Sequence, residues 1–241
     1  GGNLLPGSSR KAAVQSCKAC REGNAHYGGN ADEDKMKQIW IRHGMTKGNR
    51  EKRYIGSGTD EGLCSEGIRL LQEKKKSGIY LPVKKVYVSP MRRCLETAEI
   101  LYPQIEPEIV YDFRECDFGL FENRNHEELS GNAFYQEWID SNASLPFPEG
   151  EAPSDFCSRS VLAFLRLAEN DGCLQDTAFV VHGGTIMAVF SKLDVKKADF
   201  YAYHVENGLG YTCRMQENAD KGSSAKIQLY DCRRLLWEEA D

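Results

Sequence analysis

The sequence predicts an α/β protein, a three-layer α/β/α sandwich with a mostly parallel central sheet. From Met36 onward, short apolar runs rich in β-branched and aromatic residues alternate with segments of helical length. This alternation is typical of a parallel sheet with helices on its faces. The 241-residue chain is 41% hydrophobic and 28% charged, a composition that suits one globular domain with a substantial core.

Each predicted element rests on its own local pattern. The expected strands are apolar runs at residues 38–41, 85–89, 109–111 and 178–181, with two later strands near 208–215 and 226–232. The expected helices cover residues 65–77, 91–101, 126–139, 154–169 and 185–191. In the fourth helix, Phe156, Ser160, Ala163, Phe164 and Leu167 fall on one face, and Pro153-Ser154 is a plausible start.

The first strand ends at Arg42-His43-Gly44, followed by a polar loop. Gly44 allows a sharp turn and a close approach of the backbone to a ligand. Open α/β sheets bind their ligands at this edge, beyond the carboxyl ends of the strands. Taken alone, an Arg-His pair in this place also suits a solvated strand end, so the remaining junctions decide its meaning.

The second junction runs from a strand through Ser89-Pro90 into a helix, with Ser89 as the expected N-cap and Pro90 at the first helical position. Arg92 and Arg93 then lie in the first turn, where the helix dipole disfavours cations. Such a conflict is expected where an anion binds. A pair of surface arginines is the alternative, and Arg93 in particular is consistent with a surface position.

The third junction repeats the design of the first. An apolar strand ends at His182, and Gly183-Gly184 lead into a helix whose first N–H groups are placed to donate to an anion. One histidine in such a place is usually structural. Two strand-terminal histidines, each followed by glycine, favour a shared site.

A stretch of carboxylates interleaved with aromatic residues lies between these junctions. Glu115 and Glu122 lie near Phe113, Phe118 and Phe121. Partial desolvation by these rings would raise the pKa of a carboxyl group and suit it to donate a proton. A surface loop explains the neighbouring aspartates equally well.

Composition excludes several classes of protein. A net charge of −5 without a basic cluster gives no case for nucleic acid as a partner, and no apolar run is long enough for a membrane span. Nine scattered cysteines suggest reduced thiols in a cytoplasmic protein rather than a disulfide framework. Cys17 and Cys20 with His26 form the one candidate metal group, but a second ligand pair at zinc spacing is missing. Residues 1–35 are expected to be a flexible extension or the remnant of a longer or artificial chain, with a short helix around 10–20 as an alternative; residues 36–241 form the domain.

Over roughly residues 37–232, the chain resembles the histidine phosphatase superfamily, also called phosphoglycerate mutase-like. The motifs that carry the resemblance occur in the family's order: Arg42-His43-Gly44 with Thr46 and Asn49, then Ser89-Pro90-Met91-Arg92 with Thr97-Ala98, then Val181-His182-Gly183-Gly184. The resemblance implies the phosphoglycerate mutase-like α/β/α fold.

The resemblance also implies a role for each matched residue. His43 is the nucleophile that becomes phosphorylated, and Arg42, Arg92 and His182 hold the phosphoryl oxygens. Glu115 is the proton donor. Asn49, Gly183 and Arg53 are expected to contact the substrate or its phosphate. This chemistry needs no metal or other cofactor, and the expected partner is a small phosphomonoester rather than nucleic acid or a membrane.

Within the family, Arg53-Tyr54-Ile55-Gly56 and the Phe118–Glu122 segment most resemble the α-ribazole phosphatase branch, which acts in cobalamin synthesis. Aromatic residues Phe121, Phe134, Tyr135, Trp138 and Phe147 are expected to form a cover that holds a flat leaving group, although core packing explains any single one of them. Two alternatives stay open: a phosphatase or mutase acting on sugar or glycolytic phosphates, and a catalytically silent module that binds phosphorylated ligands. Oligomeric state is not predicted.

Overall fold

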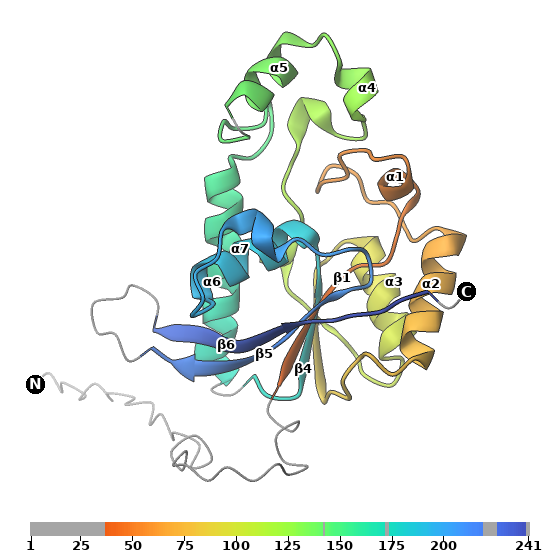
Figure 1. Ribbon diagram of the computed structural model, residues 1–241, viewed down its shortest axis with the longest axis vertical. Helices are drawn as coiled ribbons and strands as arrows, with labels where there is room; N and C mark the ends of the chain where they lie inside the picture. The colour runs from red at the N-terminus through yellow and green to blue at the C-terminus, as the bar shows by residue number, and fades with distance from the viewer. Residues whose placement is uncertain (1–36, 142, 172–173, 219–225, 240–241) are drawn as a thin grey trace, which may run out of the picture.

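The computed structural model describes residues 37–141, 143–171, 174–218 and 226–239 (Figure 1). It confirms the predicted α/β fold, with a six-stranded central sheet in the order β3-β2-β4-β1-β5-β6. The strands are β1 (Gln38–Arg42), β2 (Lys85–Val88), β3 (Glu108–Ile109), β4 (Thr177–Val181), β5 (Gly210–Glu217) and β6 (Ile227–Arg234). The α-helices are α1 (Lys47–Arg50), α2 (Ser65–Lys76), α3 (Arg92–Leu101), α4 (His126–Leu129), α5 (Ala133–Asp140), α6 (Pro153–Asp171) and α7 (Gly183–Leu193).

The sheet is mixed, with a parallel part that carries the strand-to-helix junctions. Strands β3, β2, β4 and β1 pair in parallel, whereas β5 is antiparallel to both β1 and β6. Arg42 at the end of β1 is in register with Val181 at the end of β4. The residues that follow these two strands therefore emerge side by side at one edge of the sheet.

Alternating side chains of the buried strands supply both faces of the sheet. Trp40 and Phe179 stack at 4.2 Å between ring centroids on the face that α6 and α7 cover. Ile39 and Ile41 point to the opposite face, where α2 and α3 pack. This period-2 pattern produces three layers, since each face of the sheet excludes water with its own pair of helices.

A third apolar cluster lies outside the sandwich, in the cover (residues 113–150). Helices α4 and α5 of the cover project beyond the sheet at one end of the molecule (Figure 1). Phe121, Leu129, Tyr135, Trp138 and Phe147 are buried there and pack with Phe156 of α6. The aromatic residues therefore hold the cover to the sandwich by core packing.

The predicted helix over residues 126–139 is wrong in one respect, because the chain forms two helices there. Gly131 takes a positive φ of +80°, which ends the first, and the Asn132 side chain accepts from the Tyr135 amide to cap the second. The predicted strand over 109–111 is also shifted, since β3 ends at Ile109 and residues 111–113 form a 3-10 helix.

Ser89 is not the N-cap of α3, as the sequence suggested. Met91 occupies that position, and the Ser89 hydroxyl accepts a long 3.4 Å bond from the Met91 amide. The expected N-terminal extension, its alternative helix and the Cys17-Cys20-His26 group lie outside the described residues. Among the described helices, none is long and apolar enough to cross a membrane.

Candidate active site

Three strand-to-helix junctions meet at the carboxyl edge of the parallel strands. The His43 amide donates to the Val181 carbonyl at 2.9 Å, and the Ser89 amide donates to the Val180 carbonyl at 3.1 Å. The rings of His43 and His182 lie 5.2 Å apart, inclined by 66°. Sheet register alone thus brings together residues that are far apart in the sequence.

His43 has one ring nitrogen engaged and one free. Its side chain is buried, with 4% exposed, and Nδ1 lies 2.7 Å from the Gly44 carbonyl oxygen. A carbonyl only accepts, so Nδ1 carries the proton and Nε2 keeps its lone pair. Burial, together with the nearby guanidiniums of Arg93 and Arg42, holds the pKa of His43 well below its ordinary value of 6.5. The ring is therefore neutral at pH 7.

His182 is oriented by Ser89. The Ser89 hydroxyl lies 2.7 Å from His182 Nε2. The hydroxyl has two acceptor sites besides its hydrogen, so it can accept from the Met91 amide and donate to Nε2 at once; in that arrangement the His182 proton lies on Nδ1. Nδ1 faces the Glu115 carboxyl, 3.9 Å from Oε2. In that tautomer, His182 presents an N–H group to the space between itself and Glu115.

Two arginines surround the histidines: Arg42 is partly buried and Arg93 fully buried, and neither forms an ion pair with a carboxylate of the described residues. Arg42 donates from Nη1 to the Val205 carbonyl at 2.8 Å. Arg93, fully buried, donates to the carbonyls of Thr59 at 2.9 Å and Gly56 at 3.0 Å. In the part of the chain that is described, Nε of each arginine is buried and lacks a hydrogen-bond partner. Buried N–H groups without acceptors are costly, and an anion bound between them would satisfy both.

Glu115 adds a carboxyl to the group. Oε1 accepts from the Cys116 amide at 3.0 Å, and burial raises the pKa of Glu115 above its ordinary value of 4.5. A Cβ atom at Gly184 would lie 2.7 Å from Oε1, so the backbone of α7 can approach the carboxyl only because residue 184 is glycine. The Arg159 guanidinium donates to the backbone carbonyls of Glu115 and Arg114, at 2.9 and 2.8 Å. Arg159 therefore fixes the segment that carries the acid.

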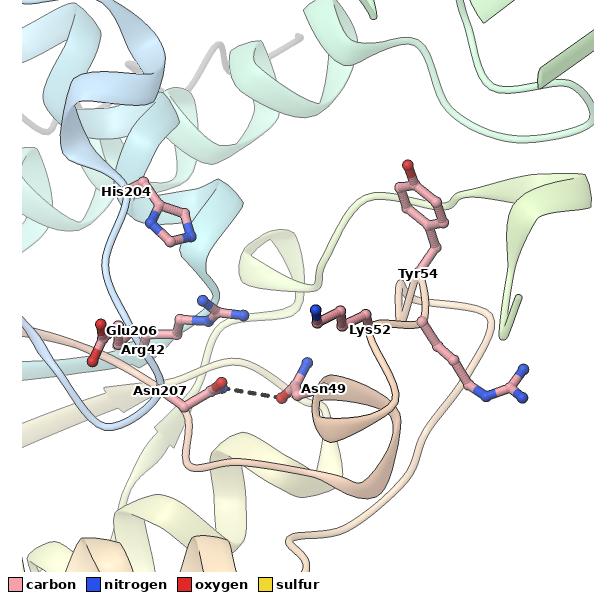
Figure 2. Close-up of a pocket in the computed structure, with 8 residues that line it drawn as sticks. Arg42, Asn49, Lys52, Tyr54, His204, Glu206 and Asn207 are labelled. Carbon is pink, nitrogen blue, oxygen red and sulfur yellow. Dashed lines mark hydrogen bonds between the residues drawn. The ribbon is translucent and has the colours of Figure 1, made fainter. Parts of the chain in front are cut away.

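A pocket of about 660 Å³ opens beside Arg42 (Figure 2). The side chain of Asn49 lines it, with Oδ1 accepting from Asn207 Nδ2 at 3.0 Å and from the Thr46 amide at 3.2 Å. Lys52 and Tyr54 line the same side, while His204 and Glu206 line the other. Arg42 belongs both to the lining of this pocket and to the group around the two histidines.

Comparison with known proteins identifies the family of the chain. The sequence model of the histidine phosphatase superfamily (branch 1) matches residues 39–222. The chain belongs to that superfamily.

Several relatives of this superfamily member are known. "Probable phosphoglycerate mutase GpmB" of Escherichia coli O1:K1 / APEC is 26% identical over 129 residues, which cover 52% of this chain and 60% of that protein. The chain therefore spans about 60% of the length of such curated relatives.

Solved structures share the fold over most of the chain. The alpha-ribazole phosphatase from Shigella flexneri superposes with a TM-score of 0.67 at 23% identity, covering 83% of this chain and 96% of that one. A phosphoserine phosphatase from Entamoeba histolytica, in complex with 3-phosphoglyceric acid, has a TM-score of 0.63 at 24% identity and covers 74% and 90%. At these identities the likeness shows the fold, and it confirms the phosphoglycerate mutase-like class.

The structure brings together four of the residues that the sequence predicted for the site of this superfamily member: Arg42, His43, Glu115 and His182. Gly183 begins α7 directly after His182, where a Cβ atom would lie 3.5 Å from Arg42 Cδ. Arg53 lines the pocket, but its guanidinium is committed to Glu51 and Glu128, each at 2.8 Å.

The assignment of Arg92 to the site is corrected. Its side chain is 66% exposed, and Nε donates to Glu96 at 2.7 Å on the surface of α3. Arg93, the next residue, enters the buried group instead. Because α3 begins at Arg92, a rotation of about 100° per residue turns one arginine outward and its neighbour inward.

Sequence reasoning missed other residues of this site. Lys52, His204 and Asn207 line the pocket without belonging to a recognised motif, and only the fold brings residues 204–207 beside β1. No sequence pattern singled out Arg159 either, because it lies within the regular helix α6. The sequence did point to the position of Arg93. Two arginines in the first turn of a helix are disfavoured by the helix dipole, and either of them could bind an anion there.

Proposed function

We propose that this histidine phosphatase superfamily member hydrolyses phosphomonoesters through a phosphohistidine on His43. The observation that carries the proposal is a neutral, buried His43 with Nε2 free, beside two guanidiniums whose buried Nε–H groups have no acceptor among the described residues. Phosphoryl transfer chiefly requires positioning and positive charge around the transferred oxygens. Both requirements are met by this group.

In the first half-reaction, Nε2 of His43 attacks phosphorus and the bond between phosphorus and the leaving oxygen breaks. Arg42, Arg93 and the Nδ1–H of His182 hold the phosphoryl oxygens. Glu115, whose pKa is raised by burial, gives a proton to the leaving oxygen from its protonated form. The products are phosphohistidine, the free alcohol and an ionised Glu115.

In the second half-reaction, water attacks the phosphohistidine. The Glu115 carboxylate takes a proton from this water as the oxygen–phosphorus bond forms and the bond from phosphorus to Nε2 breaks. Inorganic phosphate leaves, and both His43 and Glu115 return to their starting protonation states. This is the histidine acid phosphatase type of phosphomonoesterase.

Two substrate classes are supported by different observations. Likeness in fold to alpha-ribazole phosphatase supports a nucleoside-type phosphate such as α-ribazole phosphate. The relative named for phosphoglycerate mutase and the phosphatase solved with 3-phosphoglyceric acid support a small acidic phosphate. The aromatic rings expected to hold a flat base are mostly core: Phe121, Tyr135, Trp138 and Phe147 are at most 9% exposed. Tyr54 is the aromatic side chain among the described residues that line the pocket.

Turnover by a His43→Ala variant tests the proposal. We expect the parent to hydrolyse p-nitrophenyl phosphate and to form an acid-labile phosphoenzyme, and the variant to do neither, because the bond to phosphorus cannot form. His126→Ala, on the cover, serves as a matched histidine control and should keep both activities. Melting temperatures of all three proteins show that each is folded.

Two other outcomes would contradict the proposal. If the parent binds phosphate esters but neither turns them over nor becomes phosphorylated, the protein is a silent binding module. If His43→Ala hydrolyses the ester as fast as the parent, the nucleophile is another group and the proposal is wrong.

A further inference from the structure

The backbone of Lys52 has a conformation that its residue type disfavours. Lys52 follows the C-cap Glu51 of α1 with a φ of +54°. Glycine is the usual residue at this position, because it alone has no Cβ to clash in the left-handed region. Strain of this kind persists where the surrounding structure enforces it and is concentrated at ligand sites.

The surrounding structure holds this turn on both sides. The Lys52 amide donates to the Asn49 carbonyl at 3.1 Å, and the Arg53 amide donates to the Gly48 carbonyl at 2.9 Å. The Arg53 guanidinium then fastens the turn to the cover through Glu128 and the Asn123 carbonyl. The position of Lys52 is therefore set by its neighbours, although its own side chain is exposed.

The Lys52 side chain points across the pocket toward Arg42. Figure 2 shows its ammonium group directed at the Arg42 guanidinium, with His204 above them and the Glu206 carboxylate turned away. No described residue accepts a hydrogen bond from the Lys52 ammonium. Two cations that face each other across an open space repel, and an anion between them removes that repulsion. The pocket is large enough, at about 660 Å³, to hold a small molecule there.

We propose that Lys52 binds a second anionic group of the substrate, a carboxylate or a second phosphate on the leaving group, while the buried group holds the transferred phosphoryl. This inference rests on the proposed function. If Lys52 has this role, the protein should prefer small phosphomonoesters with an acidic leaving group. Nucleoside-type phosphates should be poorer substrates, because their leaving group carries no negative charge for Lys52 to bind. Arg42 lies between the two anions and contacts both the pocket and the buried site.

Matched substrate pairs test this role. 3-Phosphoglycerate and glycerol 3-phosphate differ mainly in a carboxylate, and fructose 1,6-bisphosphate and fructose 6-phosphate differ in a second phosphate. We expect the parent to prefer the more acidic member of at least one pair in kcat/KM. Lys52→Gln should lower that preference by about tenfold, because a charge-assisted contact is lost. If the preference falls within the 3-phosphoglycerate pair, Lys52 binds a carboxylate; if it falls within the fructose pair, Lys52 binds a second phosphate.

Two further variants separate recognition from structure. Lys47→Gln changes an exposed lysine on α1, the short helix that precedes Lys52, and should leave the preference unchanged. Lys52→Gly should also lose the preference while raising the melting temperature, because glycine accepts the positive φ without strain. If the role of Lys52 is only structural, both Lys52 variants should keep the substrate preference of the parent as long as the turn stays folded.

Calorimetric binding makes the result independent of turnover. Titration of 3-phosphoglycerate and fructose 1,6-bisphosphate into the parent and Lys52→Gln should show weaker binding to the variant by a similar factor. If the parent proves catalytically silent, the proposed function fails, yet these titrations still decide the role of Lys52. Equal affinities and equal preferences in the parent and Lys52→Gln overturn the inference.

Discussion

The free nitrogen of His43 depends on a chain of hydrogen bonds that begins on α3. Thr97 Oγ1 donates to the Arg93 carbonyl at 2.6 Å and accepts from the Gly44 amide at 2.9 Å. The Gly44 carbonyl then accepts from His43 Nδ1. Each member is buried and satisfied by the next, so this chain of bonds fixes the tautomer of His43, the proposed nucleophile.

Adjacent arginines on α3 provide a test at the scale of single residues. We expect Arg93→Lys to reduce kcat/KM for p-nitrophenyl phosphate on the order of 10² to 10³, since one positioned donor to the phosphoryl oxygens is typically worth that much. Arg92→Lys should stay within about twofold of the parent, because the Arg92 side chain is exposed and pairs with Glu96.

Lysine keeps the charge at both positions, so the comparison isolates the guanidinium geometry. Thermal melts show whether Arg93→Lys, which also loses bonds to loop carbonyls, remains folded. A severe loss in Arg92→Lys with a normal Arg93→Lys would restore the original assignment of Arg92.

Most of the central residues of this group could be predicted from the sequence, because motif and strand-end position indicated the same side chains. His43 and His182 each follow a buried strand, and the sheet register makes them neighbours. Arg93 could not be chosen over Arg92, since both obey the same pattern and only the first residue of α3 decides which one turns inward. Lys52 could not be predicted either, because its role depends on a positive φ that no local pattern requires of lysine.

At the scale of elements, a loop between α1 and α2 joins the buried group to the cover. The Arg93 guanidinium holds the carbonyls of Gly56 and Thr59 from one side. From the other side, the Glu122 carboxylate accepts from the amides of Gly56 and Gly58 and from the Thr59 hydroxyl, at 2.8 to 3.1 Å. One arginine and one glutamate therefore clamp the same short loop from the sandwich and from the cover.

Glu122→Gln should loosen this clamp. An amide presents an NH₂ group to donors, so several of these bonds are lost, and we expect a destabilisation of about 1–3 kcal/mol in urea unfolding. KM should rise more than kcat falls, because the loop borders the turn that carries Lys52 and leaves His43 in place. Glu127→Gln on exposed α4 is the control. Equal unfolding midpoints for the two variants would show that the loop does not depend on Glu122.

The division between α4 and α5 shows why element boundaries were less predictable than the elements themselves. Leu129 before the break and Tyr135 and Trp138 after it are all buried in the cover. The apolar stripe therefore continues across Gly131, and periodicity alone favours one long helix. A turn with a positive φ at Gly131 ends α4, and the Asn132 cap begins α5. Both are local features that hydrophobic periodicity does not predict.

Considered as a whole, the molecule concentrates positive charge in one place although its net charge is −5. Burial by the three layers keeps His43 and His182 neutral and lowers the pKa of each, while the same burial raises the pKa of Glu115. The resting site thus holds two arginines, two neutral histidines and a carboxyl whose pKa is raised. It is poised for an anion because its uncompensated charge is positive.

The pH profile of catalysis tests this charge state. Attack requires neutral His43, whose pKa is lowered, so kcat/KM should fall on the acid side only at a pH below 6.5. Proton donation requires protonated Glu115, whose pKa is raised, so kcat/KM should fall on the alkaline side as pH rises through a value above 4.5.

In Glu115→Gln the alkaline limb should disappear and the acid limb should remain, because glutamine does not titrate. Aryl phosphates, whose leaving group needs little protonation, should lose less rate than alkyl phosphates in this variant. The substrate's own ionisation is common to both proteins and cancels in the ratio of their profiles. An unchanged alkaline limb in Glu115→Gln would mean that another group protonates the leaving oxygen.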